Sequence, residues 1–247
     1  MCRISYLFVA MLVAVAGLVP GAAAGNAAWV DLFADGLAAF VPPAGEWTLA
    51  QSVGLDPDNP RKLLAKPGKG GIWVNGPTGK TRNLLTKQKF GDQEVHVEFM
   101  VPKGSNSGVK LHGHYEIQIR DSFGVKKLTG DDCGAVYPRA ELKPKYHHID
   151  GGIPPRVNAC KAPGEWQTLD ILFLAPRFDS TKKKIANARL VKVLLNDQVV
   201  HDNVELLTPT GDRWKNPEMA EGPLFLQADH GPVAFRNVRV RPYVPRK

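Results

Sequence analysis

Four polar side chains that can transfer protons or bind hydroxyl groups lie at alternate positions within one short segment. They are His112, His114, Glu116 and Gln118. The odd positions from Val109 to Ile119 are mostly apolar, and a period of two is typical of a half-buried β-strand. Side chains two residues apart on a strand project from one face at spacings of about 6.6–6.8 Å. The segment therefore predicts one face directed to a core and an opposite face rich in imidazole, carboxyl and amide groups.

Two backbone arrangements are compatible with this alternation, because it continues through Gly113. The segment forms either one long strand or two strands that meet at a tight bend. In both cases the polar face could bind sugar hydroxyls and transfer protons, or it could be the solvated outer face of a sheet. Lys110 shares the even positions, and both Lys110 and Asp121, which follows the segment, are candidates for binding substrate.

A second candidate group lies near the C-terminal end. Asp229 directly precedes His230, and Gly231-Pro232 follow them in a segment between two expected strands. The pair places a possible base and its orienting acid on a turn, although an Asp-His pair can equally be a surface turn. Gln227 precedes the pair, and Arg236 follows it, where it could clamp an anion or form a structural ion pair.

Polar residues also flank the alternating segment. Asn106, in Asn106-Ser107-Gly108, could present an amide at the rim of a site or simply begin a strand. The sequence from Glu116 to Asp121 resembles the Glu-x-Asp-x-x-Glu signature of jelly-roll β-glucanases, but its middle acid is Gln118. Glycoside hydrolysis normally uses two carboxylates that flank the bond. The replacement therefore disfavours an ordinary glucanase.

Metal binding is a weaker hypothesis. His112 and His114, two residues apart, could join Glu116 as ligands of a divalent ion, but no signature such as His-Glu-x-x-His supports it. Cys133 and Cys160 lack a zinc-binding spacing. They could form a disulfide or remain two buried thiols.

Composition and patterning favour an all-β protein. Of 247 residues, 24 are Gly and 20 are Pro, and charged residues make up 23%, which excludes disorder of the whole chain and favours short strands with tight turns. Strands are expected at 29–33, 47–50, 72–74, 94–101, 166–174, 189–195, 199–201, 224–227 and 233–240, with Pro/Gly/Asp-rich chain joining the second and third. Residues 121–162 read as a long irregular segment. No amphipathic helix is evident, so we expect a single antiparallel two-layer β-sandwich.

The first 24 residues have the pattern of a secretory signal peptide. A basic start precedes an apolar run from Ile4 to Val19, and Ala22-Ala23-Ala24 offer a cleavage site. The run is shorter than the roughly 20 residues that span a bilayer. We therefore expect a secreted or periplasmic domain over residues 25–247, with no membrane span after cleavage. The net charge of +8 is dispersed and no nucleic-acid motif accompanies it, so nucleic acid is not an expected partner.

Several short motifs occur together in a characteristic order. They are Leu84-Leu85-Thr86-Lys87, Phe90-Gly91-Asp92, Asn106-Ser107-Gly108-Val109, Tyr115-Glu116-Ile117-Gln118-Ile119 with Asp121, Pro163-Gly164-Glu165-Trp166, Leu195-Asn196-Asp197, and the run 226–233 with Phe235-Arg236-Asn237. Over residues 29–243 the chain resembles the 3-keto-disaccharide hydrolase family, also described as the 3-keto-α-glucoside-1,2-lyase/3-keto-2-hydroxy-glucal hydratase domain. The resemblance implies a concanavalin-like (jelly-roll) β-sandwich.

The resemblance also implies a chemistry. The substrates would be glucosides that a separate dehydrogenase has already oxidised to a ketone at C3. A base removes the acidified C2 proton, the C1 substituent leaves by β-elimination, and water adds to the resulting glucal, so that the net reaction is hydrolysis. A non-catalytic carbohydrate-binding or laminin-G-like module is the main alternative.

Residue roles follow from this resemblance. The C2 base would be either His230, held by Asp229, or Glu116. His112, His114 and Gln118 would bind the enolate oxygen directly or through a divalent metal, and Asn106, Gln227 and Arg236 would orient hydroxyls. Only Gly113 separates His112 from His114, where relatives are expected to have a longer insertion, and this is expected to reshape the cleft. The segment between Cys133 and Cys160, with Tyr146-His147-His148, is expected to set the aglycone side.

Overall fold

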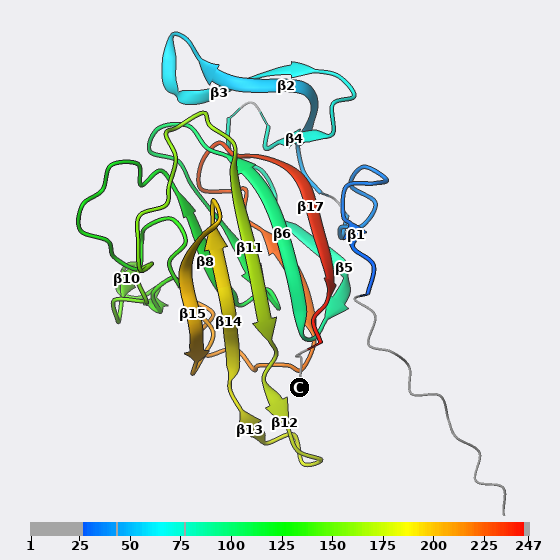
Figure 1. Ribbon diagram of the computed structural model, residues 1–247, viewed down its shortest axis with the longest axis vertical. Coiled ribbons are helices and arrows are strands. Elements are labelled where there is room, and N and C mark those ends of the chain that lie inside the picture. Colours follow the sequence, from blue (N-terminus) through cyan, green and yellow to red (C-terminus); the bar gives the residue numbers. More distant parts are fainter. Residues whose placement is uncertain (1–26, 43, 77, 245–247) are drawn as a thin grey trace, which may run out of the picture.

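Two antiparallel β-sheets stack face to face in the computed structural model, which describes residues 27–42, 44–76 and 78–244 (Figure 1). All regular secondary structure of these residues is β-strand. None of the described residues forms a helix with the length and apolar character needed to cross a membrane. The expected signal peptide, residues 1–24, lies outside the described residues, and the domain boundary at residue 25 stays a prediction.

The larger sheet has nine strands. Their order is β15 (Gln198–Leu206), β14 (Ala188–Leu195), β11 (Gln167–Leu174), β6 (Gln93–Met100), β17 (Ala234–Pro242), β4 (Ile72–Val74), β2 (Thr48–Asp56) and β3 (Asn59–Pro67), and β1 (Val30–Asp31) also pairs with β17. The smaller sheet has the order β5 (Leu84–Phe90), β16 (Gly222–Leu226), β7 (Asn106–Leu111) and β8 (Tyr115–Arg120). Two short pairs, β9 (Ala140–Glu141) with β10 (His147–His148) and β12 (Arg177–Phe178) with β13 (Lys184–Ala186), lie in the connections. The predicted all-β sandwich is confirmed.

The core lies between the inner faces of the two sheets. On β6, Val95, Val97 and Phe99 are buried, while Glu94, His96 and Glu98, which alternate with them, are only partly buried. These side chains belong to one apolar cluster with Ile117 and Ile119 of β8. Removing a large apolar side chain from water contributes roughly 1.5–3 kcal/mol, so the alternation of each strand fixes which of its faces turns inward and which remains available for polar side chains.

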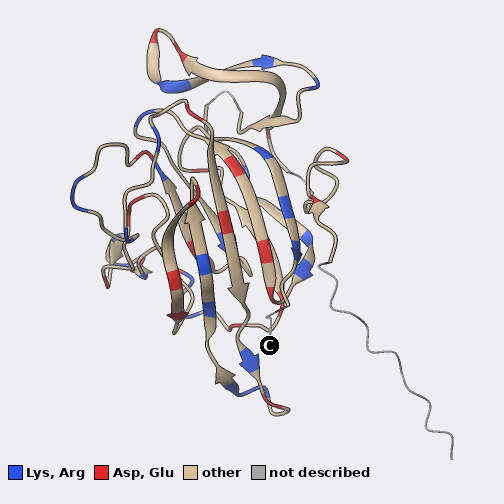
Figure 2. Ribbon diagram, viewed as in Figure 1, with Lys and Arg blue, Asp and Glu red and all other residues tan. Residues whose placement is uncertain are grey.

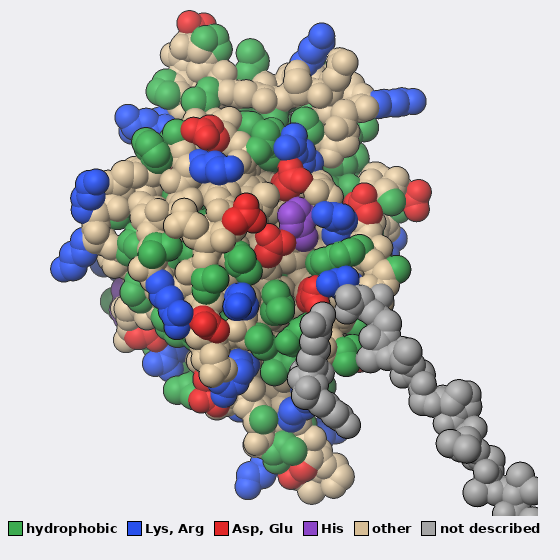
Figure 3. Space-filling model, in the orientation of Figure 1, with side chains coloured by type: hydrophobic (Ala, Val, Ile, Leu, Met, Phe, Trp, Pro, Cys, Tyr) green, Lys and Arg blue, Asp and Glu red, His purple; other side chains and the backbone are tan. Residues whose placement is uncertain are grey.

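The outer face of the larger sheet is covered by paired charges. Figure 2 shows acidic and basic residues along neighbouring strands, and Figure 3 shows acidic and basic side chains interspersed with hydrophobic ones on the same face. Glu94 of β6 pairs with Arg241 of β17, and Glu98 pairs with Arg236. The outer face of the larger sheet therefore carries pairs of opposite charge across adjacent strands, and these pairs stabilise the strand pairing.

The alternating segment forms a β-hairpin. Strands β7 and β8 pair in antiparallel register, with Lys110 opposite Glu116 and Gly108 opposite Gln118. The chain reverses at His112 and Gly113, which adopt positive φ angles of 52° and 70°. Of the two arrangements compatible with the sequence, the structure therefore has two strands that meet at a tight bend. The reversal brings Lys110 and Glu116 together, although six positions separate them in the chain.

The long segment 121–162 covers the free edge of β8. Tyr137 N–H donates a hydrogen bond to the carbonyl of Glu116 (3.1 Å), and Gln118 N–H donates to the carbonyl of Ala135 (2.9 Å). These bonds anchor the segment beside the polar face of β8. Cys133 and Cys160, both within this segment, are buried free thiols, so the structure has the second of the two states considered for them.

One connection differs from the sequence-based expectation. Residues between 51 and 71, expected to be irregular, form most of the β2–β3 hairpin that projects at the top of Figure 1. Most side chains of β3 are exposed or only partly buried, so the segment has no apolar alternation that would reveal a strand. The strand β5 was also not expected, because three consecutive residues within it, Lys87-Gln88-Lys89, are polar and exposed and interrupt any apolar alternation.

Candidate active site

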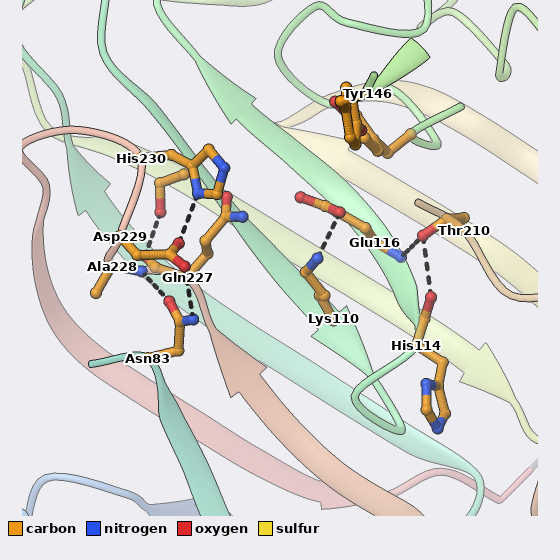
Figure 4. Close-up of polar contacts among 12 residues, drawn as sticks. Asn83, Lys110, His114, Glu116, Tyr146, Thr210, Gln227, Ala228, Asp229 and His230 are labelled. Atoms are coloured by element: carbon orange, nitrogen blue, oxygen red, sulfur yellow. Dashed lines mark hydrogen bonds and ion pairs between the residues drawn. The ribbon is translucent and has the colours of Figure 1, made fainter. Parts of the chain in front are cut away.

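A pocket of about 510 Å³ lies on the polar face of the smaller sheet. Seven residues singled out from the sequence line it: Asn106, Lys110, Glu116, Gln118, Gln227, Asp229 and His230. They come from β7, β8 and the turn between β16 and β17. Figure 4 shows the Lys110–Glu116 pair and the Asp229–His230 pair facing the same space.

Strand register builds the floor of the pocket. Phe225 of β16 lies opposite Lys110 of β7, which lies opposite Glu116 of β8, so the three residues form one row across the sheet. Gly108 makes room for the row, because a Cβ atom at this position would lie 2.5 Å from Oε1 of Glu116. A glycine inside a strand often marks such a close approach.

Glu116 and Lys110 form a nearly buried ion pair. The Lys110 Nζ atom lies 2.8 Å from Oε2 of Glu116, whose side chain is only 3% exposed. The ammonium group also lies 5.2 Å from the centre of the Phe225 ring. Because an unpaired buried charge is costly, each member of the pair keeps the other in place. The pair therefore holds the ammonium group of Lys110 in a fixed position at the floor of the pocket.

The Asp229–His230 pair has the geometry of an oriented base. The Nδ1 atom of His230 lies 2.6 Å from Oδ1 of Asp229, and Nδ2 of Asn83 donates a hydrogen bond to Oδ2 of Asp229 (3.1 Å). A carboxylate only accepts hydrogen bonds, so Nδ1 of His230 carries the proton and Nε2 is left to accept one. The hydrogen bond to Asp229 raises the pKa of His230, although burial opposes the shift. Burial alone would raise the pKa of Asp229, but the hydrogen bonds from His230 and Asn83 lower it.

Three amide side chains at the pocket have unsatisfied oxygen atoms. Oδ1 of Asn106, Oε1 of Gln118 and Oε1 of Gln227 have no hydrogen-bond partner among the described residues. Gln118 and Gln227 are 1% and 8% exposed, and buried polar atoms are normally paired. Such acceptors suit a ligand that carries several hydroxyl donors.

Comparison with known proteins places the chain in a family. Residues 28–241 match the model of the 3-keto-alpha-glucoside-1,2-lyase-like domain. The chain belongs to this family. The match spans the sandwich and every residue of the pocket, so the resemblance inferred from the motifs is confirmed.

Solved structures similar to this member of the 3-keto-alpha-glucoside-1,2-lyase-like family include two proteins of Parabacteroides distasonis, both provisionally assigned as glycosyl hydrolases. The first has 25% sequence identity and a TM-score of 0.56, over 83% of this chain and 86% of the other. The second has 18% identity and a TM-score of 0.54, over 87% and 100% of the respective chains. Among curated proteins none matches the chain. The family and the first structure together support a carbohydrate-active enzyme.

The two histidines of the bend do not lie where the alternation placed them. His112 is 1% exposed and outside the pocket. Its ring nitrogens lie 3.2 Å from the carbonyl oxygens of Met219 and Gly91, and its ring packs edge-on against Phe173. Burial lowers its pKa. The expectation of a shared wall with Glu116 was wrong for His112, because the chain reversal at this residue breaks the period of two.

His114 is also outside the residues that line the pocket. Its backbone carbonyl accepts hydrogen bonds from the N–H and hydroxyl of Thr210 (3.0 and 2.9 Å). Its ring points away from the Lys110–Glu116 pair in Figure 4, and burial lowers its pKa. His114 binds the loop at Thr210 through its backbone. The alternation had placed its side chain on the same wall as Glu116, and this expectation was wrong.

Asp121 and Arg236, both expected near the substrate, have structural contacts outside the pocket. Asp121 accepts hydrogen bonds from the backbone N–H groups of Gly104 (2.9 Å) and Phe123 (3.3 Å), which shape the turn after β8. Arg236 lies on the larger sheet, where Nε is 2.6 Å from Oε2 of Glu98 and the guanidinium lies 4.0 Å from the centre of the Trp166 ring. Neither residue lines the pocket, so the expectation that they contact substrate there was wrong.

The donor set suggested for a divalent metal does not assemble. Both ring nitrogens of His112 face backbone carbonyls in the core, and Glu116 is paired with Lys110. Over the described ranges, no group of three or more His, Cys, Asp or Glu residues has an arrangement that could hold a metal ion. The residues proposed from the sequence therefore do not fit a metal.

Several pocket residues were not identified individually from the sequence. Asn83, Tyr137, Arg213 and Phe225 line the pocket, yet they come from four separate segments without a shared motif. Tyr146, from the segment that is expected to set the aglycone side, also lines it. The hydroxyl oxygens of Tyr146 and Tyr137 lie 2.9 Å apart, so the segment contributes a pair of hydrogen-bonded phenols to the pocket.

Proposed function

We propose that this protein cleaves 3-keto-glucosides, including 3-keto-disaccharides, by β-elimination and then hydrates the product, so that the net reaction is hydrolysis. The observation that carries the proposal is the placement of an oriented imidazole, His230, in the same pocket as a fixed ammonium group, Lys110. Family membership supports the same reaction class. Removal of a proton from the carbon beside a carbonyl needs a base for the proton and a positive group for the enolate oxygen that forms.

The first step is removal of the C2 proton. The C3 ketone acidifies this proton, and Nε2 of His230 accepts it while Nδ1 remains hydrogen-bonded to Asp229. The electron pair of the C2–H bond forms the enolate. A positioned general base typically contributes about 10²–10⁴ in rate. Glu116 is the weaker candidate, because its carboxylate is held by Lys110 at 2.8 Å.

Lys110 stabilises the enolate. Its ammonium group is fixed by Glu116 and lies over Phe225, away from bulk water. A preorganised donor at an oxyanion typically lowers the barrier by about 2.7–4 kcal/mol. When the enolate collapses, the C3 carbonyl re-forms, a C1=C2 double bond appears and the C1–O bond breaks. Water then adds across the double bond to give the free 3-keto sugar.

The amides bind the rest of the sugar. The unpaired oxygens of Asn106, Gln118 and Gln227 would accept hydrogen bonds from sugar hydroxyls. A saturated hydroxyl at C3 would leave the C2 proton non-acidic, so a separate dehydrogenase must supply the ketone. We also propose, from residues 1–24, that the protein acts in the periplasm or outside the cell.

Substrate selectivity tests this function. The purified protein is incubated with a 3-keto-glucoside and, in parallel, with the same glucoside unoxidised, each with and without EDTA. We expect release of the aglycone only from the keto sugar, and equally with EDTA. Turnover of the unoxidised sugar would replace the proposal with ordinary glycoside hydrolysis, and binding without turnover would replace it with a carbohydrate-binding module. Loss of activity in EDTA would require a metal site that the residues described above do not form.

A further inference from the structure

A hydrogen-bonded chain of aromatic side chains borders the pocket on the side of the segment 121–162. The hydroxyl oxygens of Tyr137 and Tyr146 lie 2.9 Å apart, and Nε2 of His148 lies 3.0 Å from the hydroxyl of Tyr137. Oδ1 of Asp131 lies 3.8 Å from the same ring nitrogen. Both tyrosines line the pocket.

The chain is rigidly built. The ring of His148 stacks edge-on against Tyr137 and Tyr146, with ring centres 5.2 and 5.7 Å apart. The backbone of Tyr137 is bonded to Glu116 of β8, and His148 belongs to the short β9–β10 pair, opposite Ala140. Figure 4 shows Tyr146 across the Lys110–Glu116 pair from His230. The two ends of the pocket therefore carry an imidazole base and a phenol.

The proposed elimination needs a group of this kind. When the C1–O bond breaks, the leaving oxygen must receive a proton unless it departs as a stable anion. His230 has just accepted the C2 proton, and Glu116 is held as the partner of Lys110. Burial raises the pKa of Tyr137 and that of Tyr146, so both phenols keep their protons at neutral pH.

We propose that Tyr146 is the general acid that protonates the leaving group, and that Tyr137 and His148 are positioning residues that resupply its proton. Tyr146 gives its hydroxyl proton to the leaving oxygen as the C1–O bond breaks. Tyr137 passes a proton to Tyr146, and the Nε2–H group of His148 passes one to Tyr137 while Nδ1 of His148 takes one up from water. His148 stays neutral and changes only its tautomer, and His230 returns the C2 proton to water, so the protons balance. The aglycone then lies at the Tyr146 end of the pocket. This inference rests on the proposed function.

Leaving groups of different basicity test the acid. A p-nitrophenyl 3-keto-glucoside needs no protonation of its leaving group, whereas the methyl 3-keto-glucoside does. For Tyr146→Phe we expect kcat on the methyl substrate to fall by about a hundredfold or more, with little change in KM, while kcat on the aryl substrate stays within about threefold. Tyr137→Phe and His148→Gln should show the same split with smaller losses on the methyl substrate. His147→Gln is the matched control, because His147 is the exposed neighbour of His148 on β10 and its Nδ1 contacts only the carbonyl of Lys145.

Equal losses on both substrates in the folded Tyr146→Phe variant would overturn the assignment, as would unchanged turnover of the methyl substrate. If that variant does not fold, the split in Tyr137→Phe and His148→Gln decides the question in the same way.

Proton exchange separates failure of this inference from failure of the function. The probe is 3-keto-1,5-anhydroglucitol, which has no leaving group at C1, in D₂O. Wild type and Tyr146→Phe should both exchange the C2 proton, because exchange needs only the base. If wild type neither exchanges this proton nor cleaves either glucoside, the proposed function itself is wrong. If wild type exchanges the proton and cleaves the glucosides, but Tyr146→Phe loses no more activity on the methyl substrate than on the aryl substrate, only the assignment of the acid is wrong.

Discussion

At the scale of single residues, the arrangement of Asp229, His230 and Asn83 separates the two candidate bases that the sequence left open. Asn83 fixes Asp229, and Asp229 fixes the tautomer of His230. Glu116 has no comparable freedom, since Lys110 is bonded to its carboxylate. The pair of oppositely charged groups at the floor and the acid-base pair at the wall therefore perform different tasks. Residue type alone could not assign them, because either a carboxylate or an imidazole can remove a proton beside a carbonyl.

The pH dependence of kcat/KM tests His230 as the base. Only the form with unprotonated Nε2 accepts the C2 proton, and the hydrogen bond to Asp229 raises the pKa above its usual value near 6.5. Activity on the aryl keto-glucoside should therefore rise with pH through a midpoint above that value. Asp229→Asn should shift this midpoint to lower pH and reduce the plateau, while His230→Ala should reduce the plateau by about a hundredfold or more and remove the midpoint.

Glu116→Gln is the comparison variant for that measurement. It weakens the anchoring of Lys110 and should lower kcat, but the midpoint of the pH profile should remain in place. If the midpoint disappears in Glu116→Gln and persists in His230→Ala, Glu116 is the base and the assignment is reversed.

At the scale of the elements, the β7–β8 hairpin determines which of the predicted residues meet. The apolar alternation of Val109, Leu111, Ile117 and Ile119 correctly predicted strand structure and its inward face, but it left open whether there is one strand or two. It also predicted that Lys110 and Glu116 share the opposite face. It failed at His112, because a positive φ angle in the bend turns the side chain into the core. A period of two holds only within a strand, and a single sequence does not show where a tight bend interrupts it.

Gly108 links the backbone of this hairpin to the chemistry. A Cβ atom here would approach Oε1 of Glu116 to 2.5 Å, so Gly108→Ala must displace the carboxylate or the strand. We expect a loss of about 1–3 kcal/mol in the free energy of unfolding and a fall in kcat on the methyl and aryl keto-glucosides alike. Gly54→Ala in β2 is the matched control, because a Cβ atom there meets nothing within 4 Å. Denaturant unfolding and steady-state kinetics would measure both, and a fully active, equally stable Gly108→Ala would contradict the packing described above.

At the scale of the whole molecule, the fold was predictable and the pocket only partly so. Alternating strands such as β6 and β11 are encoded locally and were predicted close to their observed positions. The pocket joins Asn83, Glu116, Tyr146 and His230, which are brought together by sheet order and by the loop along β8. Their proximity is a property of the tertiary structure, so sequence reasoning could propose the members but could not show which of them meet.

The charge distribution also depends on the tertiary structure. The net charge of +8 gave no location for a binding surface. Glu94 and Glu98 on the outer face of the larger sheet are matched by arginines of β17, whereas the smaller sheet keeps Lys110 beside unpaired amide oxygens in a hollow. The face suited to a neutral, hydroxyl-rich ligand is therefore the face of the smaller sheet.

The central claim is that the bond is broken by elimination after removal of the C2 proton. Its most direct test is cleavage of a 3-keto-glucoside in D₂O. The released aglycone is quantified against the sugar product, and NMR then shows whether C2 of that sugar carries hydrogen or deuterium. A no-enzyme sample and the His230→Ala variant correct for spontaneous exchange of the product. Elimination and hydration predict that the 3-keto sugar formed at early times carries deuterium at C2. A product that retains its original C2 proton would show direct hydrolysis and would contradict the account.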